Sequence, residues 1–135
     1  MAAAAEAFLD TNVLLYLLSA DAAKADRAEE VVSAGGVVSV QVLNEFASVA
    51  TRKLGMRVAE AAEVLAAVRA VCRVVPLEEE THDLGMQIAE RHRLSIYDAM
   101  IAAAARIAGC KVILSEDMQG GLRLGGMRIR DPFRE

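Results

Sequence analysis

The chain has few of the residues that build several common kinds of site. Its 135 residues include two cysteines, two histidines, two prolines, three phenylalanines, two tyrosines and no tryptophan. Cys72 and Cys110 lie far apart, with no Cys-x-x-Cys pair or Cys/His cluster, so neither a zinc site nor a disulfide framework is supported. We interpret both as buried, reduced thiols of a cytoplasmic protein. The shortage of aromatic rings argues against a platform for stacking bases.

Long hydrophobic runs are also missing. Charged residues interrupt every apolar run well before the roughly 18 to 20 residues that a membrane span needs, so no membrane segment is expected. The N-terminal MAAAAEAF has no basic stretch and carries Glu6, which argues against a signal peptide. The net charge of −4 provides no overall positive field for binding nucleic acid, although an acidic metal site would itself supply several negative charges.

The remaining composition is that of an ordinary folded protein. It is 55% hydrophobic and 25% charged, which separates it from disordered sequences. The length of 135 residues predicts a single domain, residues 1–135, that is large enough to bury a core. Apart from the alanine-rich start, no linker, repeat or low-complexity segment divides the chain.

Short apolar strands alternate with helical segments along the chain. Strands are expected over 7–9, 37–40, 72–77, 111–114 and, at a sheet edge, 127–130. Helices are expected over 13–18, 21–34, 42–54, 58–70, 81–92 and 95–108, several of them ended by glycine. This alternation predicts an α/β fold with three layers, in which a central parallel sheet of four to five short strands is flanked by helices. Ligands of such sheets bind beyond the carboxyl ends of the strands.

Four acidic residues fall where that edge of the sheet is expected. Asp10 follows the first strand, and Asp117 follows the fourth. Glu45 and Asp98 lie in the first turns of the helices that begin near 42 and 95. The spacing therefore brings four carboxylates toward one edge.

Each acid also has a plain structural explanation. Asp10 can cap a helix, and Asp117 can be a turn residue ahead of two glycines. Asp98 stands three residues after Ser95, the spacing of a capping box, and Glu45 can be a solvated helix residue.

The surroundings favour a shared role for the four acids. Asp98 opens IYDAMIAAAARIA, which is apolar all round, and Glu45 rises beside Val42 and Val49. Ionised carboxylates on buried elements are costly unless they are paired or bind metal, and no lysine or arginine follows Asp98 on its helix until Arg106. Mg²⁺ or Mn²⁺ prefers oxygen ligands and would remove the repulsion.

The stretches FLDTNVLLYLL, VQVLNEF, LSIYDAMIAAAA and ILSEDMQGG resemble, in order, the four motifs of PIN-domain nucleases. The likeness is closest to VapC-type toxins of toxin–antitoxin modules and runs from about residue 7 to the MRIRDPF ending. No single motif is specific, but four in this order and spacing are.

The resemblance implies a set of site residues and a reaction. It implies that Asp10, Glu45, Asp98 and Asp117 bind Mg²⁺ or Mn²⁺ and are catalytic, with Glu116 as a possible substitute for Asp117. Thr11 or Asn12, together with Ser115, would orient the carboxylates. The implied reaction is hydrolysis of an RNA phosphodiester, in which one or two metal ions lower the pKa of a bound water and neutralise charge on the phosphate.

The resemblance also implies partners: an RNA substrate, a cognate antitoxin protein and a second copy of the chain in a homodimer. Basic residues near the motifs could contact RNA phosphates or be plain surface residues. They are Arg91 and Arg93, and on a second strip Arg123, Arg128 and Arg130.

Two other readings of the sequence are weaker. A receiver domain needs an acceptor Asp after its third strand, and a haloacid-dehalogenase phosphatase needs Asp-x-Asp after its first; VVPLEEET and Asp10-Thr11-Asn12 provide neither. A catalytically silent PIN-like module that binds RNA or protein is the alternative to the enzyme, and the intact set of four acids argues against it.

Overall fold

The computed structural model describes residues 6–118 and 123–134 of the chain. Within these residues one sheet runs through the molecule, with the strand order β3-β2-β1-β4-β6-β5. All neighbouring strands are parallel except β5 and β6, which are antiparallel. The strands are β1 (Ala7–Leu9), β2 (Gly36–Ser39), β3 (Cys72–Val75), β4 (Val112–Leu114), β5 (Arg123–Leu124) and β6 (Met127–Arg130).

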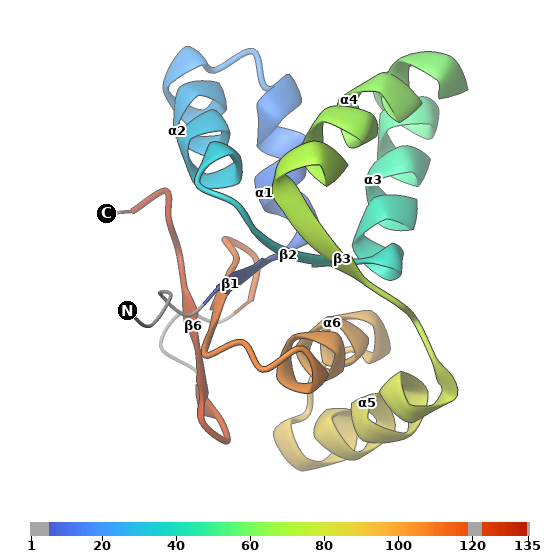
Figure 1. The fold of residues 1–135 in the computed structure, drawn as a ribbon, viewed down its shortest axis with the longest axis vertical. Helices are drawn as coiled ribbons and strands as arrows, with labels where there is room; N and C mark the ends of the chain where they lie inside the picture. The colour runs from blue at the N-terminus through green and yellow to red at the C-terminus, as the bar shows by residue number, and fades with distance from the viewer. Residues whose placement is uncertain (1–5, 119–122, 135) are drawn as a thin grey trace.

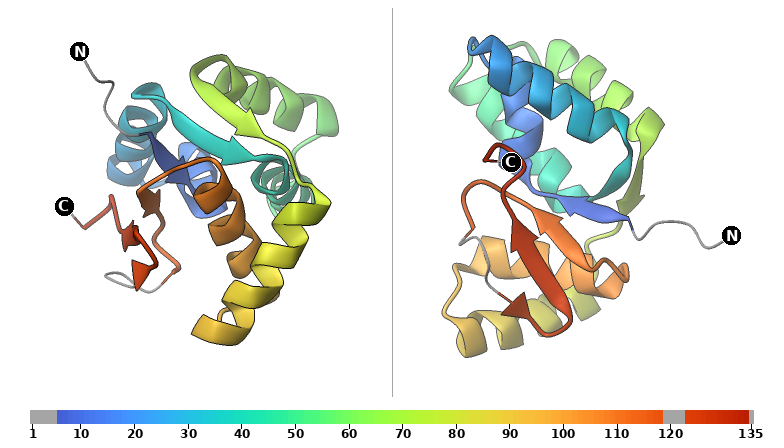
Figure 2. Two further views of the ribbon diagram at one scale, coloured as in Figure 1. Left: turned by 60° about the horizontal axis from the view of Figure 1, so that its bottom comes forward. Right: turned by 90° about the vertical axis from the view of Figure 1, so that its left-hand side faces the viewer.

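Helices cover both faces of this sheet. Figure 1 shows α1 to α4 on one face and the pair α5 and α6 on the other, and Figure 2 shows the same layers from two further sides. The helices are α1 (Thr11–Leu15), the 3₁₀ helix η1 (Tyr16–Leu18), α2 (Ala22–Ser33), α3 (Val40–Arg52), α4 (Val58–Val71), α5 (Glu79–His92) and α6 (Ile96–Ile107). The prediction of a three-layer α/β fold is confirmed. No helix in the described ranges is both long and apolar enough to cross a membrane.

The sheet forms because its strands are apolar on both faces. Phe8, Val37, Val38 and Ile113 are fully buried between the two helical layers. Such continuous burial is typical of parallel strands, which lose both faces to covering helices. Gly36 allows β1 and β2 to approach closely, since a Cβ added there would lie 2.7 Å from the carbonyl oxygen of Ala7.

The sheet departs from the sequence prediction at one end. We expected four to five strands with 127–130 at the edge, but β6 lies between β4 and β5, and β5 is the edge strand of a six-stranded sheet in the described part of the chain. The edge prediction is wrong because β5 has only two residues, too few to show a hydrophobic period. Gly125, with φ of +66°, lets the chain turn directly from β5 into β6.

The strand order determines where a site can form. From β1 the chain continues to β2 and β3 on one side, whereas β4 and β6 pair on the other. The order therefore reverses between β1 and β4, and ligands of open α/β sheets bind at the carboxyl ends of such neighbours. The backbone joins the two strands there, since the N–H of Asp10 donates to the carbonyl of Leu114 at 3.0 Å.

Candidate active site

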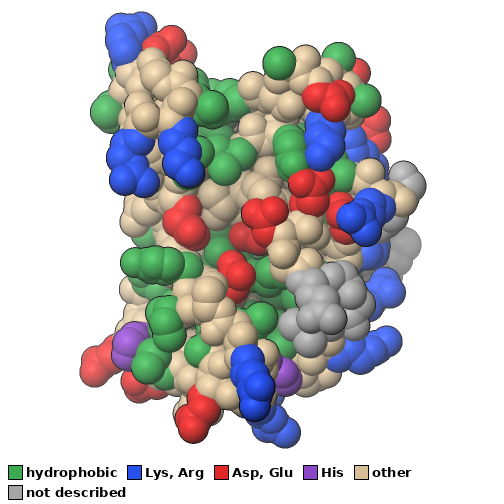
Figure 3. Space-filling model, turned by 180° about the vertical axis from the view of Figure 1, so that it is seen from behind, with side chains coloured by type: hydrophobic (Ala, Val, Ile, Leu, Met, Phe, Trp, Pro, Cys, Tyr) green, Lys and Arg blue, Asp and Glu red, His purple; other side chains and the backbone are tan. Residues whose placement is uncertain are grey.

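The four predicted acids surround the carboxyl ends of β1 and β4. Asp10 directly follows β1, and Asp117 lies three residues after the end of β4. Glu45 belongs to the second turn of α3, and Asp98 to the first turn of α6. Acidic side chains gather in the middle of the face that Figure 3 shows, with lysine and arginine toward its margins.

Electrostatic coupling links all four acids. The charges of Asp98 and Glu45 both raise the pKa of Asp10, and the charge of Asp117 raises the pKa of Asp98. Within residues 6–118 and 123–134, none of the four forms a salt bridge with lysine or arginine. The cluster is therefore a concentration of negative charge without a compensating cation.

Asp10 is the most firmly held member of this cluster. Its side chain is 4% exposed. One carboxylate oxygen, Oδ1, accepts the backbone N–H of Thr11 at 2.7 Å. The other, Oδ2, accepts the Ser115 hydroxyl at 2.7 Å and the Asn12 amide at 3.2 Å. These bonds fix the plane of the carboxylate.

Burial dominates the ionisation of Asp10. The pKa of Asp10 is raised from 3.8 to about 6, chiefly by removal from water and in smaller part by the charges of Asp98 and Glu45, while the hydrogen bonds from Ser115 and Thr11 oppose the rise. A carboxylate that is both buried and surrounded by like charge is stabilised by a bound cation. Asp10 is also the N-cap of α1, so its capping and clustering roles coexist.

Asn12 and Ser115 join the first and fourth motifs. The Asn12 amide donates to Ser115 Oγ at 3.3 Å, and its oxygen Oδ1 accepts the backbone N–H of Glu116 at 3.1 Å. Ser115 Oγ also accepts the N–H of Met118 at 3.0 Å. The backbone around Asp117 is thereby tied to the segment that carries Asp10. Asn12 and Ser115 both donate hydrogen bonds to the Asp10 carboxylate.

Glu45 is held by two polar neighbours. The Thr11 hydroxyl donates to Glu45 Oε2 at 3.4 Å, and the Gln41 amide donates to the same oxygen at 3.2 Å. Gln41 is buried and also donates to the carbonyl of Tyr97 at 3.0 Å, one residue before Asp98. Sequence analysis missed Gln41; the available clue was its position four residues before Glu45, which places both on one helix face.

The Asp98 carboxylate is not the cap of its helix. Ser95 Oγ caps α6 by accepting the backbone N–H of Asp98 at 3.2 Å. Burial raises the pKa of Asp98, the Ser95 side chain lowers it, and Asp117 raises it. The capping-box explanation therefore accounts for Ser95 and leaves the half-buried Asp98 carboxylate facing the other acids.

Glu116 belongs to a separate network. It accepts the Tyr16 hydroxyl and forms a salt bridge with Lys24 at 2.9 Å. The hydrogen bonds from Tyr16 and Lys24 lower the pKa of Glu116, and the bond from Tyr16 has the larger effect. The Tyr16 ring packs edge-on against Phe133, with 4.7 Å between ring centroids. Glu116 is thus occupied by a cation of the protein, whereas Asp117 is not.

The predicted RNA-binding arginines lie in separate places. Arg91 lines a small cavity beside α5, whereas Arg93 is the exposed, left-handed residue that ends this helix. Arg123 and Arg128 stand directly opposite each other on β5 and β6, and both are exposed.

The four acids have the oxygen ligands that a hard divalent cation such as Mg²⁺ prefers. All four acids offer oxygen, and Asp10 is held in a defined plane by three hydrogen bonds. In the described part of the chain, however, no three His, Cys, Asp or Glu side chains approach closely enough to enclose a metal ion. Asp10 is the buried member of the group, whereas Glu45 and Asp98 are half-buried and Asp117 is exposed.

Comparisons with known proteins identify the family of the chain. The PIN domain family model matches residues 7–119, a range that contains all four acids. No curated protein matches the chain.

Solved structures of toxins share the fold. The sarcin-ricin-loop-cleaving toxin VapC20 of Mycobacterium tuberculosis is 24% identical, with a TM-score of 0.66 over 82% of this chain and 88% of that one. A toxin–antitoxin complex from Klebsiella pneumoniae is 16% identical, with a TM-score of 0.71 over 93% of this chain and 97% of that one. DNA-bound VapBC from Salmonella typhimurium is 22% identical, with a TM-score of 0.69 over 96% of this chain and 99% of that one. With the family model covering most of its length, the chain belongs to the PIN domain family.

Proposed function

We propose that the chain is an endoribonuclease dependent on Mg²⁺ or Mn²⁺ and the toxin of a VapBC-type toxin–antitoxin pair. The observation that carries the proposal is the group of four carboxylates around β1 and β4. In this group buried Asp10 has a pKa of about 6 and, among the described residues, forms no salt bridge. Membership of the PIN family supports a nuclease, and the toxin–antitoxin structures of the same fold support an antitoxin partner.

Each residue of the site has a part in this proposal. A divalent cation held by Asp10, Glu45, Asp98 and Asp117 would activate a water molecule and neutralise charge on the scissile phosphate. Ser115, Asn12 and the Thr11 backbone keep the Asp10 carboxylate in one plane. Thr11 and Gln41 hold Glu45 toward the same centre. Preset orientation of this kind tightens metal binding.

The proposed setting follows from the same family likeness. The chain would act as a homodimer in the cytoplasm, where RNA is the substrate and the antitoxin the inhibitor. Cys72 and Cys110 are both buried and free, which is consistent with a reducing compartment.

A cleavage assay tests the proposal. The full chain, free of antitoxin, is incubated with total cellular RNA and Mg²⁺ or Mn²⁺, beside an EDTA control and the variants Asp98→Asn and Asp83→Asn. Asp83 is an exposed aspartate of α5 and serves as the matched control. We expect EDTA and Asp98→Asn to reduce cleavage on the order of 100-fold or more, the upper end of losses at metal sites, and Asp83→Asn to leave it unchanged.

The alternative is a catalytically silent PIN-like module that binds RNA or protein. It is favoured by the present spacing of the acids, of which no three in the described ranges enclose a metal ion. If folded wild type and Asp98→Asn are equally inactive, and calorimetric titration with Mn²⁺ detects no binding, the alternative replaces the enzyme. Circular dichroism shows whether both proteins are folded.

A further inference from the structure

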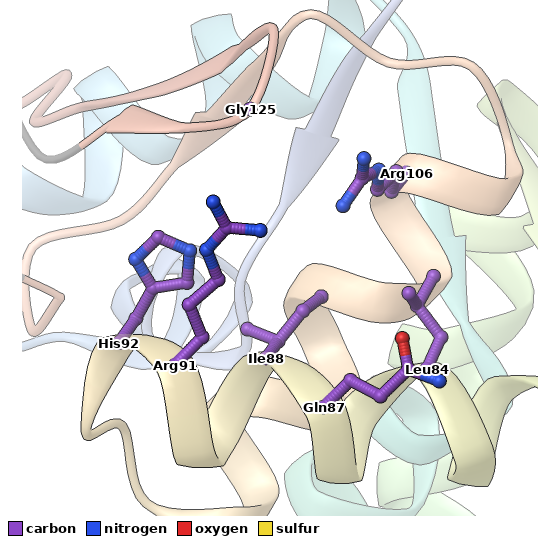
Figure 4. A pocket seen from close by; sticks show the side chains of 7 residues that line it. All are labelled: Leu84, Gln87, Ile88, Arg91, His92, Arg106 and Gly125. Carbon is purple, nitrogen blue, oxygen red and sulfur yellow. The ribbon is translucent and has the colours of Figure 1, made fainter.

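A small basic cavity lies beside the α5–α6 pair. Its volume is about 160 Å³, and it is lined by Arg91 and His92 from the last turn of α5, Arg106 from the last turn of α6, and Gly125 from the turn between β5 and β6. Figure 4 shows both guanidinium groups and the imidazole reaching into one space, with Leu84 and Ile88 along its base. The consecutive helices α5 and α6 therefore bring three nitrogen-rich side chains together beside the β5–β6 turn.

The positive charge of the cavity is not balanced by an acid among the described residues. Of these residues, none that lines the cavity is aspartate or glutamate. Over the described residues, neither Arg91 nor Arg106 forms a salt bridge, whereas Lys24, Arg27, Arg57, Arg73 and Arg134 each pair with a carboxylate. The protein has a net charge of −4, so acidic residues are abundant, yet none of them pairs with these two arginines in the described residues. Arg91 and Arg106 are therefore available to bind an external anion.

The size and donors of the cavity indicate which anion. About 160 Å³ is the space of roughly five water molecules at about 30 Å³ each, and lies below the roughly 300 Å³ at which pockets for whole small-molecule ligands begin. Guanidinium groups match phosphate oxygens in geometry, and even a neutral imidazole donates one N–H. The size and the donors of the cavity therefore match a single phosphate group.

The cavity is within reach of the acid cluster along one helix. Asp98 and Arg106 are eight residues apart on α6, about 12 Å along its axis at 1.5 Å per residue. Arg91 and His92 are the last two residues of α5, and the three residues 93–95 connect this helix to α6. One strand of nucleic acid can therefore contact both the acids and the cavity.

We propose that Arg91, His92 and Arg106 form a binding site for a backbone phosphate of the RNA strand, a few nucleotides from the bond that the acid cluster cleaves. This inference rests on the proposed ribonuclease function, because it assigns part of the substrate to a second site. It adds His92 and Arg106, which were not selected from the sequence, to Arg91, which was.

Binding without cleavage tests the site independently of the enzyme. A fluorescent RNA oligonucleotide is titrated with the full chain in EDTA, which removes the divalent metal that the proposed cleavage needs, and anisotropy is followed at several salt concentrations. The variants are Arg91→Gln, Arg106→Gln and, as matched control, Arg69→Gln, an exposed arginine of α4 on the other face of the sheet.

We expect Arg91→Gln and Arg106→Gln each to weaken binding about tenfold at low salt and to reduce the salt-dependence slope by about 0.7, the value for one phosphate contact on a single strand. Arg69→Gln should change neither. Equal affinity of all four folded proteins overturns the proposal, even if the chain cleaves RNA in Mg²⁺. Conversely, an inactive chain that shows the predicted losses retains the phosphate site while the nuclease proposal fails.

Two competitors identify the source of the anion. Inorganic phosphate should displace the oligonucleotide only weakly, at millimolar concentration, and a glutamate-rich peptide should not displace it. If inorganic phosphate binds in an Arg106-dependent manner but the oligonucleotide does not, the cavity is a small-anion site and the proposal is wrong. If the peptide binds through Arg91 and Arg106 and the oligonucleotide does not, the surface belongs to an acidic protein partner instead.

Discussion

The hydroxyl of Ser115 donates to Oδ2 of Asp10 at 2.7 Å, joining residues 105 positions apart at the carboxyl ends of β1 and β4. Both side chains are buried, with exposures of 0% and 4%. The bond couples the orientation of the most buried carboxylate to the loop that carries Asp117. It therefore provides a direct way to perturb the site without removing an acid.

Replacing this hydroxyl should weaken metal binding. In Ser115→Ala, Asp10 Oδ2 loses its shortest donor, and the N–H of Met118 loses its acceptor. We expect affinity for Mn²⁺, measured by calorimetry, to fall about 10- to 100-fold, and the free energy of unfolding to fall by about 1–3 kcal/mol. Ser33→Ala, at an exposed position that ends α2, is the control. Unchanged Mn²⁺ affinity in folded Ser115→Ala would show that this bond does not orient a ligand.

The raised pKa of Asp10 should make the metal-free protein more stable in mild acid. The folded pKa is about 6 and the unfolded value 3.8, so between these values the folded state binds more protons. This contribution to stability is complete below 3.8 and is lost as the pH rises through about 6. From pH 5 to pH 7, Asp10 alone should lower the free energy of unfolding by about 1 kcal/mol.

Chemical denaturation in EDTA at the two pH values measures this change. Asp10→Asn should remove the Asp10 part of the difference, while Asp26→Asn, at an exposed position on α2, should retain it. Metal binding should respond in the opposite direction, because Asp10 must lose its proton to become a ligand. If wild type and Asp10→Asn show the same pH dependence of stability, the pKa of Asp10 is not raised in the folded state.

Glu116 and its neighbour Asp117 should differ in their effect on activity. Glu116 is paired with Lys24 and Tyr16, whereas Asp117 faces Asp98. We expect Glu116→Gln to keep RNA cleavage within about threefold of wild type, because the charge of Glu116 is already compensated by Lys24. We expect Asp117→Asn to abolish cleavage. The opposite result, with Glu116→Gln inactive and Asp117→Asn active, would make Glu116 the metal ligand.

Gly36 should be essential to the pairing of β1 with β2. A Cβ at this position would lie 2.7 Å from the backbone oxygen of Ala7, which cannot move without displacing β1. We expect Gly36→Ala to lower the free energy of unfolding by about 1–3 kcal/mol, as overpacking does. Gly126→Ala is the control, because a Cβ there meets nothing within 4 Å. Urea denaturation compares the two, and equal stability would show that the strands can separate at low cost.

Much of the fold could be predicted from local pattern. The strand at 7–9 was predicted with its observed bounds, and the helices from α2 to α6 within about two residues at most ends, because each element carries its own apolar run and its own stop residue. The strand β5 and the true edge of the sheet could not be predicted, since two residues have no period and their pairing depends on the turn at Gly125. The four acids could be selected because parallel strands share one carboxyl edge.

The sequence by itself determined the three-layer α/β architecture, the family and the identity of the four acids, since these follow from hydrophobic periodicity and from the order of motifs along the chain. Only the tertiary structure decided which polar groups meet. The bonds from Ser115 to Asp10 and from Gln41 to Tyr97, and the convergence of Arg91 with Arg106, join segments that no local pattern relates. Hydrogen bonds and charges act over a few ångströms, so their partners are fixed by the packing of distant elements, not by spacing in sequence.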